Sequence, residues 1–553
     1  MVDVEGVAAE MMNIPNVVIS KTYKYMCSDP GQDLIIKDIK ENRLNRVVVS
    51  ACSPRIHELT FRKALTKAGL NPYMLQMANI REHVSWVHTD KAEATSKSKA
   101  LVAAAINRIN FHVPLDERSV TIHPATLVIG GGITGITAAL EIADAGKKVY
   151  LVENTDKLGG HAANVDLTFP YFTSVSQFMN PLIKRVHNHK NIDVFLNTEV
   201  KEISGYIGNF ETMISYKDIE RKIDFGNIII ASGLKAYDPS AIENYGYGIF
   251  PDVITSTEFE AMLKSGIILK KNGETPENIA IIHCVGSRNS NYHKYCSRVC
   301  CTVALKFANQ LRSALPDSNI YELYSDMRSM SKGCEEMYTA SSRRRIMFMM
   351  FDQKNGMPEI KNADKGDCCD MYVDVDELLS GESVRVPADM VILMTAMEGQ
   401  DNARTTGQMA GISLDANRFY IEKHPKLDPV ATTTNGVFIA GSCNSPKDFA
   451  DCVSQARAAS ARVLSLISRG TVNIAVATAY INGVLCSGCK MCISVCPYTA
   501  IGFDEKKNVS VINDVLCQGC GTCVALCRSK AIDLNGCSTK QILSELSELL
   551  LKE

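Results

Sequence analysis

Short runs of apolar and β-branched residues recur along the chain and predict the strands of an α/β protein. The clearest unit covers residues 126–153, where an apolar strand, a glycine-rich turn, a helix and a second strand follow one another. Runs of this kind are typical of strands that are buried on both faces of a parallel sheet. Further runs lie at residues 47–49, 227–230, 279–283, 390–394 and 437–441.

Helical patterns separate these strands. Residues 91–112 are rich in strong helix formers, and alanines repeat between Ala456 and Ala461. Residues 538–553 carry leucines at helical spacing, which predicts a terminal helix that packs on the domain before it or docks on a partner. Strands that alternate with helices predict parallel sheets and an α/β fold.

Composition and charge narrow the choice of partner and compartment. The chain has 59 basic and 61 acidic residues and a net charge of −2, which gives no reason to expect nucleic acid. No apolar run approaches the roughly 20 residues of a membrane span. The N-terminus lacks the basic and apolar segments of a secretory signal. Twenty cysteines in such a chain favour metal ligation in the cytoplasm over disulfides.

Two cysteine runs near the C-terminus share the spacing C-x-x-C-x-x-C-x-x-x-C, and Pro497 follows the first run. This is the pattern of a two-cluster bacterial ferredoxin, in which the fourth cysteine of each run serves the other cluster. Structural zinc and disulfides fit two identical runs less well. The predicted ligands are Cys486, Cys489, Cys492 and Cys527 for one [4Fe–4S] cluster, and Cys517, Cys520, Cys523 and Cys496 for the other.

The glycine-rich turn of residues 130–135 predicts a dinucleotide site. Gly130, Gly132 and Gly135 match G-x-G-x-x-G, in which the glycines make the turn, admit a pyrophosphate and allow close helix packing. The phosphates then face a helix N-terminus. Glu153, at the end of the next strand, is placed to accept hydrogen bonds from ribose hydroxyls.

Further short motifs favour FAD as the dinucleotide. Gly159, Gly160 and His161 follow Glu153 as in enzymes that close over the flavin diphosphate, although His161 could equally serve packing. Other segments resemble the domain crossing and second FAD motif of two-dinucleotide flavoproteins, with Ser442 where aspartate is usual. The cofactor-binding residues predicted from these segments and the helix that follows are Ala231, Gly233, Gly441, Ser442, Lys447, Asp448, Gln455 and Ala456.

A third cysteine set lies where such flavoproteins carry their nicotinamide site. Cys284 occupies the first glycine position of the expected second nucleotide turn. Together with Cys296, Cys300 and Cys301 it predicts a third [4Fe–4S] cluster that exchanges electrons with the flavin. Because the spacing is irregular, buried reduced thiols remain an alternative.

Lys447, beside Asp448, is the predicted catalytic residue. A cation near N5 of the flavin would stabilise the negative charge that the ring gains on reduction. The alternative is a surface lysine paired with Asp448.

These features together resemble the A subunit of the heterodisulfide reductases of methanogens. The resemblance implies flavin-based electron bifurcation. Electrons would enter from a hydrogenase or formate dehydrogenase and leave toward ferredoxin and the subunits that reduce the heterodisulfide of coenzymes M and B. It rests on the motifs above and on residues 25–32, 51–55, 82–88 and 441–448.

The chain departs from this family in two regions. An early Cys-His-Cys segment is absent, Val84 replaces a cysteine, and only Cys27 and Cys52 remain in the N-terminal domain. The ferredoxin domain that the family inserts is missing between about Tyr216 and Asn227, and residues 172–176 lack the family's cysteines. We therefore expect a shortened form that works with a second A-type chain, which could complete a cluster site on Cys27 and Cys52.

The predicted architecture is a thioredoxin-reductase-like flavoprotein core flanked by a small N-terminal α/β domain and a C-terminal 2[4Fe–4S] ferredoxin domain. The expected domains are an N-terminal domain at 1–115, an FAD-binding domain at 120–237 and 386–472, a cluster-bearing NAD(P)H-domain-like region at 238–385, and the ferredoxin domain with its terminal helix at 476–553.

The expected function is that of an oxidoreductase subunit with one FAD and three clusters. Two alternatives are an electron-wiring scaffold without catalytic flavin turnover and an NAD(P)H-dependent iron–sulfur flavoprotein. Cys284 in the glycine position disfavours the second alternative.

Overall fold

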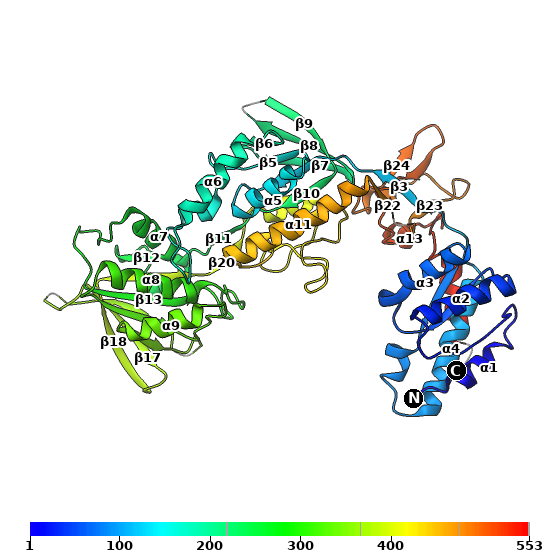
Figure 1. Cartoon of the computed structure of the whole chain (residues 1–553), viewed down its shortest axis with the longest axis horizontal. Helices are drawn as coiled ribbons and strands as arrows, with labels where there is room; N and C mark the ends of the chain where they lie inside the picture. Colours follow the sequence, from blue (N-terminus) through cyan, green and yellow to red (C-terminus); the bar gives the residue numbers. More distant parts are fainter. Residues whose placement is uncertain (217–218, 355, 365, 475, 551–553) are drawn as a thin grey trace. The chain divides into compact units, whose positions relative to one another are not determined.

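The computed structural model describes residues 1–216, 219–354, 356–364, 366–474 and 476–550 (Figure 1). The chain forms two compact units, Met1–Val120 with Asn473–Glu553, and Thr121–Val472. Strands β3 (Arg118–Thr121) and β22 (Thr471–Ile474) pair where the chain passes between the units. Each unit is described by itself below.

The second unit contains a five-stranded parallel sheet in the order β21-β10-β4-β5-β6. The predicted strands at 126–129, 149–152 and 227–230 are present at those residues, and the α/β class is confirmed. Their carboxyl ends lie at one edge of the sheet because all the pairings are parallel. The strands are β4 (Thr126–Ile129), β5 (Val149–Val152), β6 (Ile192–Phe195), β10 (Asn227–Ile230) and β21 (Val437–Ile439).

Helices cover one face of this sheet and a small antiparallel sheet covers the other. The helices are α5 (Ile133–Asp144), α6 (Val175–Asn188) and α11 (Phe449–Arg469), and α5 and α11 lie side by side in Figure 1. The antiparallel strands are β7 (Val200–Tyr206), β8 (Asn209–Tyr216) and β9 (Ile219–Phe225). Strand β9 therefore fills most of the stretch between Tyr216 and Asn227; residues 217–218 lie outside the described residues.

A second parallel sheet, in the order β12-β19-β13-β14-β15, forms the other half of this unit. Its strands are β12 (Val253–Thr255), β13 (Asn278–Val285), β14 (Asn319–Tyr324), β15 (Ile346–Met350) and β19 (Met390–Thr395). Helices α7 (Ser256–Ser265), α8 (Cys300–Ala314) and α9 (Cys334–Arg343) and strands β16 (Glu359–Asn362), β17 (Met371–Glu377) and β18 (Glu382–Ala388) accompany it. Strands β11 (Leu234–Ala236) and β20 (Met397–Gly399) pair where the chain crosses between the halves, and α10 (Ala403–Ala410) follows.

A buried ion pair joins the two halves of the second unit. The Lys306 ammonium on α8 lies 2.7 Å from the Glu260 carboxylate on α7, and the two side chains are 2% and 9% exposed. The ammonium also donates to the Leu167 carbonyl oxygen at 3.1 Å, and Glu260 accepts from the Asp166 N–H at 2.8 Å. Because Asp166 and Leu167 precede α6, the pair ties α7 and α8 to the first half.

The first unit combines the N-terminal domain with the ferredoxin domain. In the N-terminal domain, β1 (Val47–Ala51) and β2 (Leu75–Asn79) are parallel and pack with α1 (Val4–Met11), α2 (Asp29–Asn42), α3 (Pro54–Ala68), α4 (Lys91–Ile109) and the turn η1 (Arg81–Ser85). The ferredoxin domain has two strand pairs and two short helices. They are β23 (Ala479–Ile481) with β26 (Ile532–Leu534), β24 (Ile501–Asp504) with β25 (Val509–Ile512), α12 (Met491–Ser494) and α13 (Thr522–Leu526).

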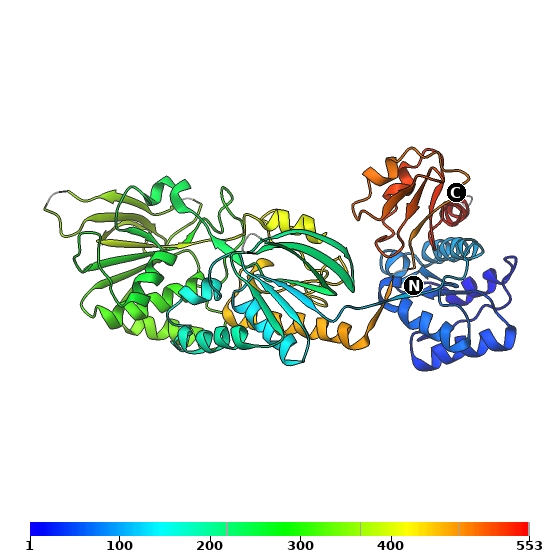
Figure 2. The ribbon, with the colours of Figure 1, turned by 90° about the horizontal axis from the view of Figure 1, so that it is seen from above.

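The predicted terminal helix is present as α14 (Thr539–Leu550), but its main packing partner differs from the expected one. It lies along α4 of the N-terminal domain, as Figure 2 shows. Glu545 accepts a hydrogen bond from Arg108 at 2.6 Å, and Gln541 donates to the Phe111 carbonyl oxygen at 3.2 Å. The sequence pattern identified the helix but gave no information about this contact across the chain.

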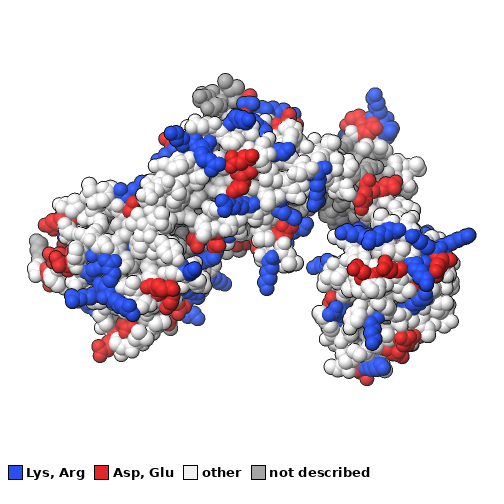
Figure 3. Space-filling model, in the orientation of Figure 1, with Lys and Arg blue, Asp and Glu red and all other residues white. Residues whose placement is uncertain are grey.

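Basic and acidic side chains are interspersed on both units over the face drawn in Figure 3, in keeping with the nearly balanced composition. Among the described residues, none of the helices is both long and apolar enough to cross a membrane.

Lys306→Met should lower the free energy of unfolding of the second unit by about 3 kcal/mol, because it leaves the Glu260 carboxylate buried without its cation. The double variant Lys306→Met/Glu260→Met should recover part of the loss. Arg457→Met is the matched control, since it breaks the exposed Arg457–Glu141 pair and should cost less than about 1 kcal/mol. Urea unfolding followed by circular dichroism gives the measurement. An effect of Lys306→Met as small as that of the control would contradict the anchoring role.

Candidate functional site

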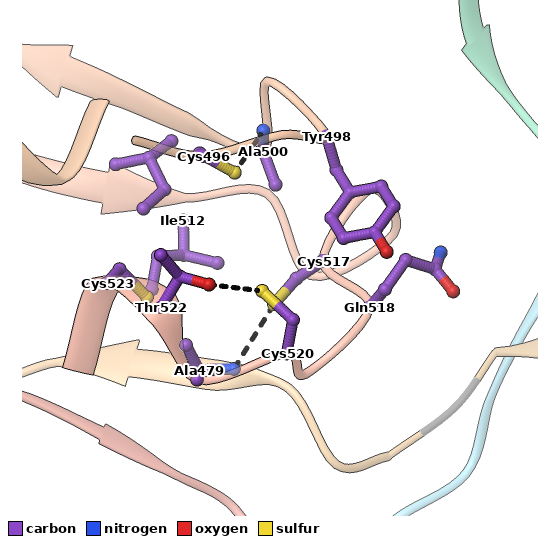
Figure 4. A pocket seen from close by; sticks show the side chains of 12 residues that line it. Ala479, Cys496, Tyr498, Ala500, Ile512, Cys517, Gln518, Cys520, Thr522 and Cys523 are labelled. Atoms are coloured by element: carbon purple, nitrogen blue, oxygen red, sulfur yellow. Dashed lines mark hydrogen bonds between the residues drawn. The ribbon is translucent and has the colours of Figure 1, made fainter. Parts of the chain in front are cut away.

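Four cysteines of the ferredoxin domain line one pocket (Figure 4). Cys517, Cys520 and Cys523 come from α13 and the loop before it, and Cys496 comes from the other cysteine run. The pocket is otherwise lined mainly by apolar residues such as Ala479, Ile501 and Ile512. The structure thus brings together the four sulfur atoms that cross-ligation predicts for one cluster.

Hydrogen bonds to sulfur and burial define the electrostatics of this pocket. The Ala479 N–H donates to Cys517 Sγ at 3.3 Å, and the Ala500 N–H donates to Cys496 Sγ at 3.3 Å. Burial, together with the neighbouring Cys517, Cys520 and Cys496, raises the pKa of the Cys523 thiol to about 11. The Cys523 thiol therefore resists ionisation as it stands, and a positively charged group such as a set of iron ions fits beside it.

The cysteines predicted for the other ferredoxin cluster have individual contacts that fit the same pattern. Cys527 Sγ accepts from the Ala531 N–H at 3.3 Å, which repeats the Cys496 arrangement in the second run. Cys492 is buried beside Ser510, with 3.3 Å between Sγ and Oγ. The grouping of Cys486, Cys489, Cys492 and Cys527 stays a prediction. Among the described residues, no group of three or more His, Cys, Asp or Glu side chains is arranged to hold a single metal ion.

The glycine turn after β4 has the packing that a dinucleotide site needs. A Cβ atom on Gly135 would lie 1.8 Å from the Gly130 carbonyl oxygen, so only glycine allows helix α5 to approach so closely. A Cβ on Gly132, by contrast, would meet nothing within 4 Å. Gly132 is the N-cap of α5, so this open space lies at a helix N-terminus. A pyrophosphate fits there.

The carboxyl ends of β4, β10 and β21 bring the other predicted flavin motifs to this turn. Gly441 packs against Thr134 in the first turn of α5, and a Cβ on Gly441 would lie 2.3 Å from Thr134 Oγ1. A Cβ on Gly160 would lie 3.1 Å from Gly132 Cα, and one on Gly233 would face Ser442 Oγ at 3.9 Å. Motifs separated by up to about 300 residues in the sequence thus meet at one edge of the sheet.

Several predicted cofactor residues also form hydrogen bonds to backbone groups of the glycine turn and the segments beside it. Glu153 is buried and accepts hydrogen bonds from the Gly131 N–H at 2.6 Å and the Thr155 N–H at 2.9 Å. The Thr155 hydroxyl also donates to Glu153 at 2.8 Å. A carboxylate has about four acceptor positions, so capacity for one ribose hydroxyl remains. Gln455 accepts from the Gly441 N–H at 2.9 Å, and His161 Nε2 lies 2.8 Å from the Leu234 carbonyl oxygen. His161 therefore has a structural partner, as the packing alternative expects.

Lys447 is held inside the second motif and is not a surface lysine paired with Asp448. Its ammonium donates to Ser445 Oγ at 2.6 Å and Asn444 Oδ1 at 2.9 Å. Asp448 instead caps α11 and accepts from the Asp451 N–H at 2.8 Å. Burial lowers the pKa of Lys447, whereas the neighbouring Cys443 thiol opposes this shift. The pairing alternative is thus wrong, while the contact with flavin N5 stays a prediction. Ala231 and Ala456 are buried beside these motifs.

Three cysteines of the third set meet at the end of β13. Cys284 takes a left-handed backbone conformation, with φ of 58°, which is uncommon for a residue other than glycine. A hydrogen bond with Cys300 lowers the pKa of Cys284 to about 7 and raises the pKa of Cys300 itself. Cys300 also forms a side-chain hydrogen bond with Cys301, and these two residues begin helix α8. Cys296 is half-buried and accepts from the Arg298 N–H at 3.3 Å; its membership of the set stays a prediction.

Buried polar atoms without hydrogen-bond partners surround this third set, and the sequence motifs gave no sign of them. The buried Tyr245 hydroxyl interacts electrostatically with Cys284, and Arg288 forms a side-chain hydrogen bond to Cys284. A buried polar atom normally finds a partner, so these groups point to a polar or charged group that belongs among the thiols. Within the part of the chain that the structure describes, the atoms without partners are Tyr245 Oη, His283 Nδ1, Ser287 Oγ, Arg288 Nη1 and Glu322 Oε1.

Comparisons with known proteins agree with both the flavin-type region and the ferredoxin domain. A family model described as pyridine nucleotide-disulphide oxidoreductase matches residues 124–282, and one described as 4Fe-4S dicluster domain matches residues 485–531. The A subunit of the H(2):CoB-CoM heterodisulfide,ferredoxin reductase of Methanothermobacter marburgensis is 37% identical over 92% of this chain and 90% of that protein. The chain belongs to the family of heterodisulfide reductase A subunits.

This family membership makes the chain an oxidoreductase subunit with an FAD-binding domain and a two-cluster iron–sulfur domain. The A subunit of the H(2)/formate:CoB-CoM heterodisulfide,ferredoxin reductase of Methanococcus maripaludis is 34% identical over 91% of this chain and 89% of that protein. Thioredoxin reductase from T. acidophilum, a solved structure, has 17% identity and a TM-score of 0.43, covering 62% of this chain and 98% of that one. The M. marburgensis alignment spans 596 positions, more than the chain's 553 residues, so the chain is a shortened form across the matched region.

Gly132→Ala should weaken FAD binding without destabilising the fold. Its Cβ would enter the open space at the N-terminus of α5, and losing one hydrogen bond to a charged phosphate costs about 1.4 kcal/mol, or about tenfold in Kd. Gly135→Ala is the contrasting variant, because its Cβ would strike the Gly130 carbonyl and should lower the unfolding midpoint. Fluorescence titration of the flavin-free chain with FAD measures the first effect. Unchanged FAD affinity in Gly132→Ala would place the pyrophosphate elsewhere.

Proposed function

We propose that this chain is the bifurcation-type electron-transfer subunit of a heterodisulfide reductase complex, with one FAD and three [4Fe–4S] clusters. The observation that supports it best is the group of converging thiols at the end of β13, in the same unit as the flavin-type turn. A cluster there would lie where related flavoproteins bind a nicotinamide, so electrons would reach the flavin through iron rather than as hydride.

The proposed cofactors differ in how many electrons they transfer. FAD exchanges electrons in pairs or singly, and each cluster passes one electron at a time. The residues of this chain bind, orient and tune these groups. The N-terminus of α5 would bind the diphosphate, and Glu153 the ribose. Lys447 would hold a positive charge near the flavin ring. The N–H groups of Ala479 and Ala500 would donate to cluster-bound sulfur and favour the reduced state.

The proposed partners follow from the names of the related proteins. Those of M. marburgensis and M. maripaludis name hydrogen, formate, ferredoxin and the CoB–CoM heterodisulfide. The chain would therefore work with the other heterodisulfide reductase subunits, a hydrogenase-type or formate dehydrogenase-type donor, and ferredoxin. The composition of the native complex, separated by gel electrophoresis after anaerobic purification, tests this set of partners.

A second A-type chain is a further proposed partner. Cys27 is exposed and Cys52 is buried, and each directly precedes the serine that caps a helix, Ser28 or Ser53. Two cysteines are too few for a complete cluster site, so ligands from another chain would have to complete it. A homogeneous complex that bifurcates electrons with this chain as its only A-type member would exclude the idea.

Anaerobically purified chain should contain about 12 iron atoms and one FAD, because three clusters of four iron atoms each are proposed. Iron and acid-labile sulfide analysis together with the absorbance spectrum gives these numbers. A measured content of about eight iron atoms per chain would show that the third cluster is absent. A chain that contains iron but no flavin would favour the scaffold alternative. Rapid turnover with NADPH would instead revive the nicotinamide alternative.

Lys447→Met should lower the midpoint potential of the bound flavin, because a cation beside the ring stabilises the negative charge gained on reduction. Spectroelectrochemical titration of the purified chain measures the potential. Lys423→Met is the matched control, since Lys423 is exposed on the surface of the same unit and its removal should leave the potential unchanged. Equal flavin potentials in the Lys447→Met variant and the natural chain would refute the role of Lys447.

A further inference from the structure

The ammonium group of Lys447 is held by acceptors that lie next to it in the sequence. It donates to Asn444 Oδ1 at 2.9 Å, to Ser445 Oγ at 2.6 Å and to the Ser445 carbonyl oxygen at 3.3 Å. A lysine ammonium has three N–H donors, so these contacts engage all of them. The ammonium therefore has a defined position in the segment that follows β21, within the second flavin motif.

The Asn444 side chain links this ammonium to a carboxylate from another segment of the chain. Its Nδ2 donates to Glu422 Oε2 at 2.6 Å and to the Tyr420 carbonyl oxygen at 3.0 Å. Both of these partners are acceptors, so only the amide nitrogen can face them, and the amide oxygen must face Lys447. A hydrogen bond to an ionised carboxylate is stronger than one between neutral groups, which makes Glu422 the firmer of the two anchors.

A backbone contact holds the segment that carries Glu422 beside the flavin motif. The Tyr420 N–H donates to the Cys443 carbonyl oxygen at 3.0 Å, and the Tyr420 side chain is buried. Glu422 and Asn444 are themselves only half-buried. The packing of the apolar core therefore does not explain why these two side chains meet, whereas an unbroken series of carboxylate, amide and ammonium does.

Glu422 could affect a bound flavin in two ways that differ in sign. Reduction adds negative charge to the ring, so a carboxylate acting by its charge alone would disfavour the reduced state, and its removal would raise the midpoint potential. A carboxylate that keeps the Lys447 ammonium in place would have the opposite effect. Its removal would let the cation leave the ring and would lower the potential.

We propose that Glu422, acting through the Asn444 amide, positions the Lys447 ammonium beside the flavin ring and thereby raises the midpoint potential of the bound flavin. Glu422 and Asn444 are positioning residues in this scheme. The inference rests on the role of Lys447 in the proposed function.

The test compares the midpoint potential of the bound flavin in variants of the full chain by spectroelectrochemical titration. Glu422→Met and Asn444→Leu break the link and should lower the potential, but by less than Lys447→Met does. Glu422→Gln keeps a side-chain oxygen that can accept from Asn444, so it should lower the potential less than Glu422→Met. When Lys447→Met is already present, adding Glu422→Met should cause no further decrease, because contacting residues are not additive.

Glu382→Met is the matched control for the loss of a carboxylate. Glu382 is an exposed residue of β18 in the same unit. The control should leave the flavin potential unchanged.

The outcomes separate this inference from the proposed function. An unchanged potential in Lys447→Met would refute the role of Lys447 itself. If Lys447→Met lowers the potential, an unchanged or raised value in Glu422→Met or Asn444→Leu, with flavin bound, would overturn the positioning role alone. A decrease that persists in full alongside Lys447→Met, or that is as large in Glu422→Gln as in Glu422→Met, would also overturn it. Loss of flavin from both Glu422→Met and Asn444→Leu would do the same, since the two residues would then be structural supports.

Discussion

One buried ammonium group, that of Lys306, links helix α8 to the flavin-type half of the second unit. It holds the Glu260 carboxylate of α7 and the Leu167 carbonyl of the flavin-type half at the same time. An ion pair in an apolar interior is stable only when its remaining hydrogen-bonding capacity is satisfied, and the contacts with Leu167 and Asp166 meet that demand. Helix α8 also carries Cys300 and Cys301 at its first turn. The same interaction therefore ties the helix that carries these cysteines to the half that contains the glycine-rich turn.

In the ferredoxin domain, cysteine ligands instead of an ion pair would hold separate parts of the chain together. One sulfur in the pocket belongs to the first cysteine run and three belong to the second, so a bound cluster would tie the two halves of the domain together. Metal binding of this kind contributes directly to folding because the ligands do not converge in the unfolded chain. The small core of this domain includes several of these cysteines, among them Cys492, Cys517 and Cys523, which links its stability to its proposed cofactors.

The sequence predicted the strands well, because they are local signals. The strand at 126–129, the glycine turn and the two cysteine runs follow from short spacings. It could not predict that α14 packs on α4, because the leucine pattern specifies a helix but not its partner. The Lys306–Glu260 pair was missed for a similar reason, since its members are 46 residues apart in the sequence. His283 did leave a signal, a single ionisable residue in an apolar strand, but the sequence could not show that its partner is Glu322 of the neighbouring strand.

In the proposed function, the third cysteine set would use the backbone of a nucleotide site for another purpose. The first residue of such a turn needs a left-handed conformation, and Cys284 adopts it at φ of 58° despite its side chain. The helix N-terminus that would otherwise face a pyrophosphate presents Cys300 and Cys301. A helix N-terminus favours a thiolate for the same reason that it favours a phosphate, because both are anions near unpaired N–H groups. In the proposed third cluster, sulfur ligands at the turn and the first helical positions would therefore take the place of a dinucleotide phosphate.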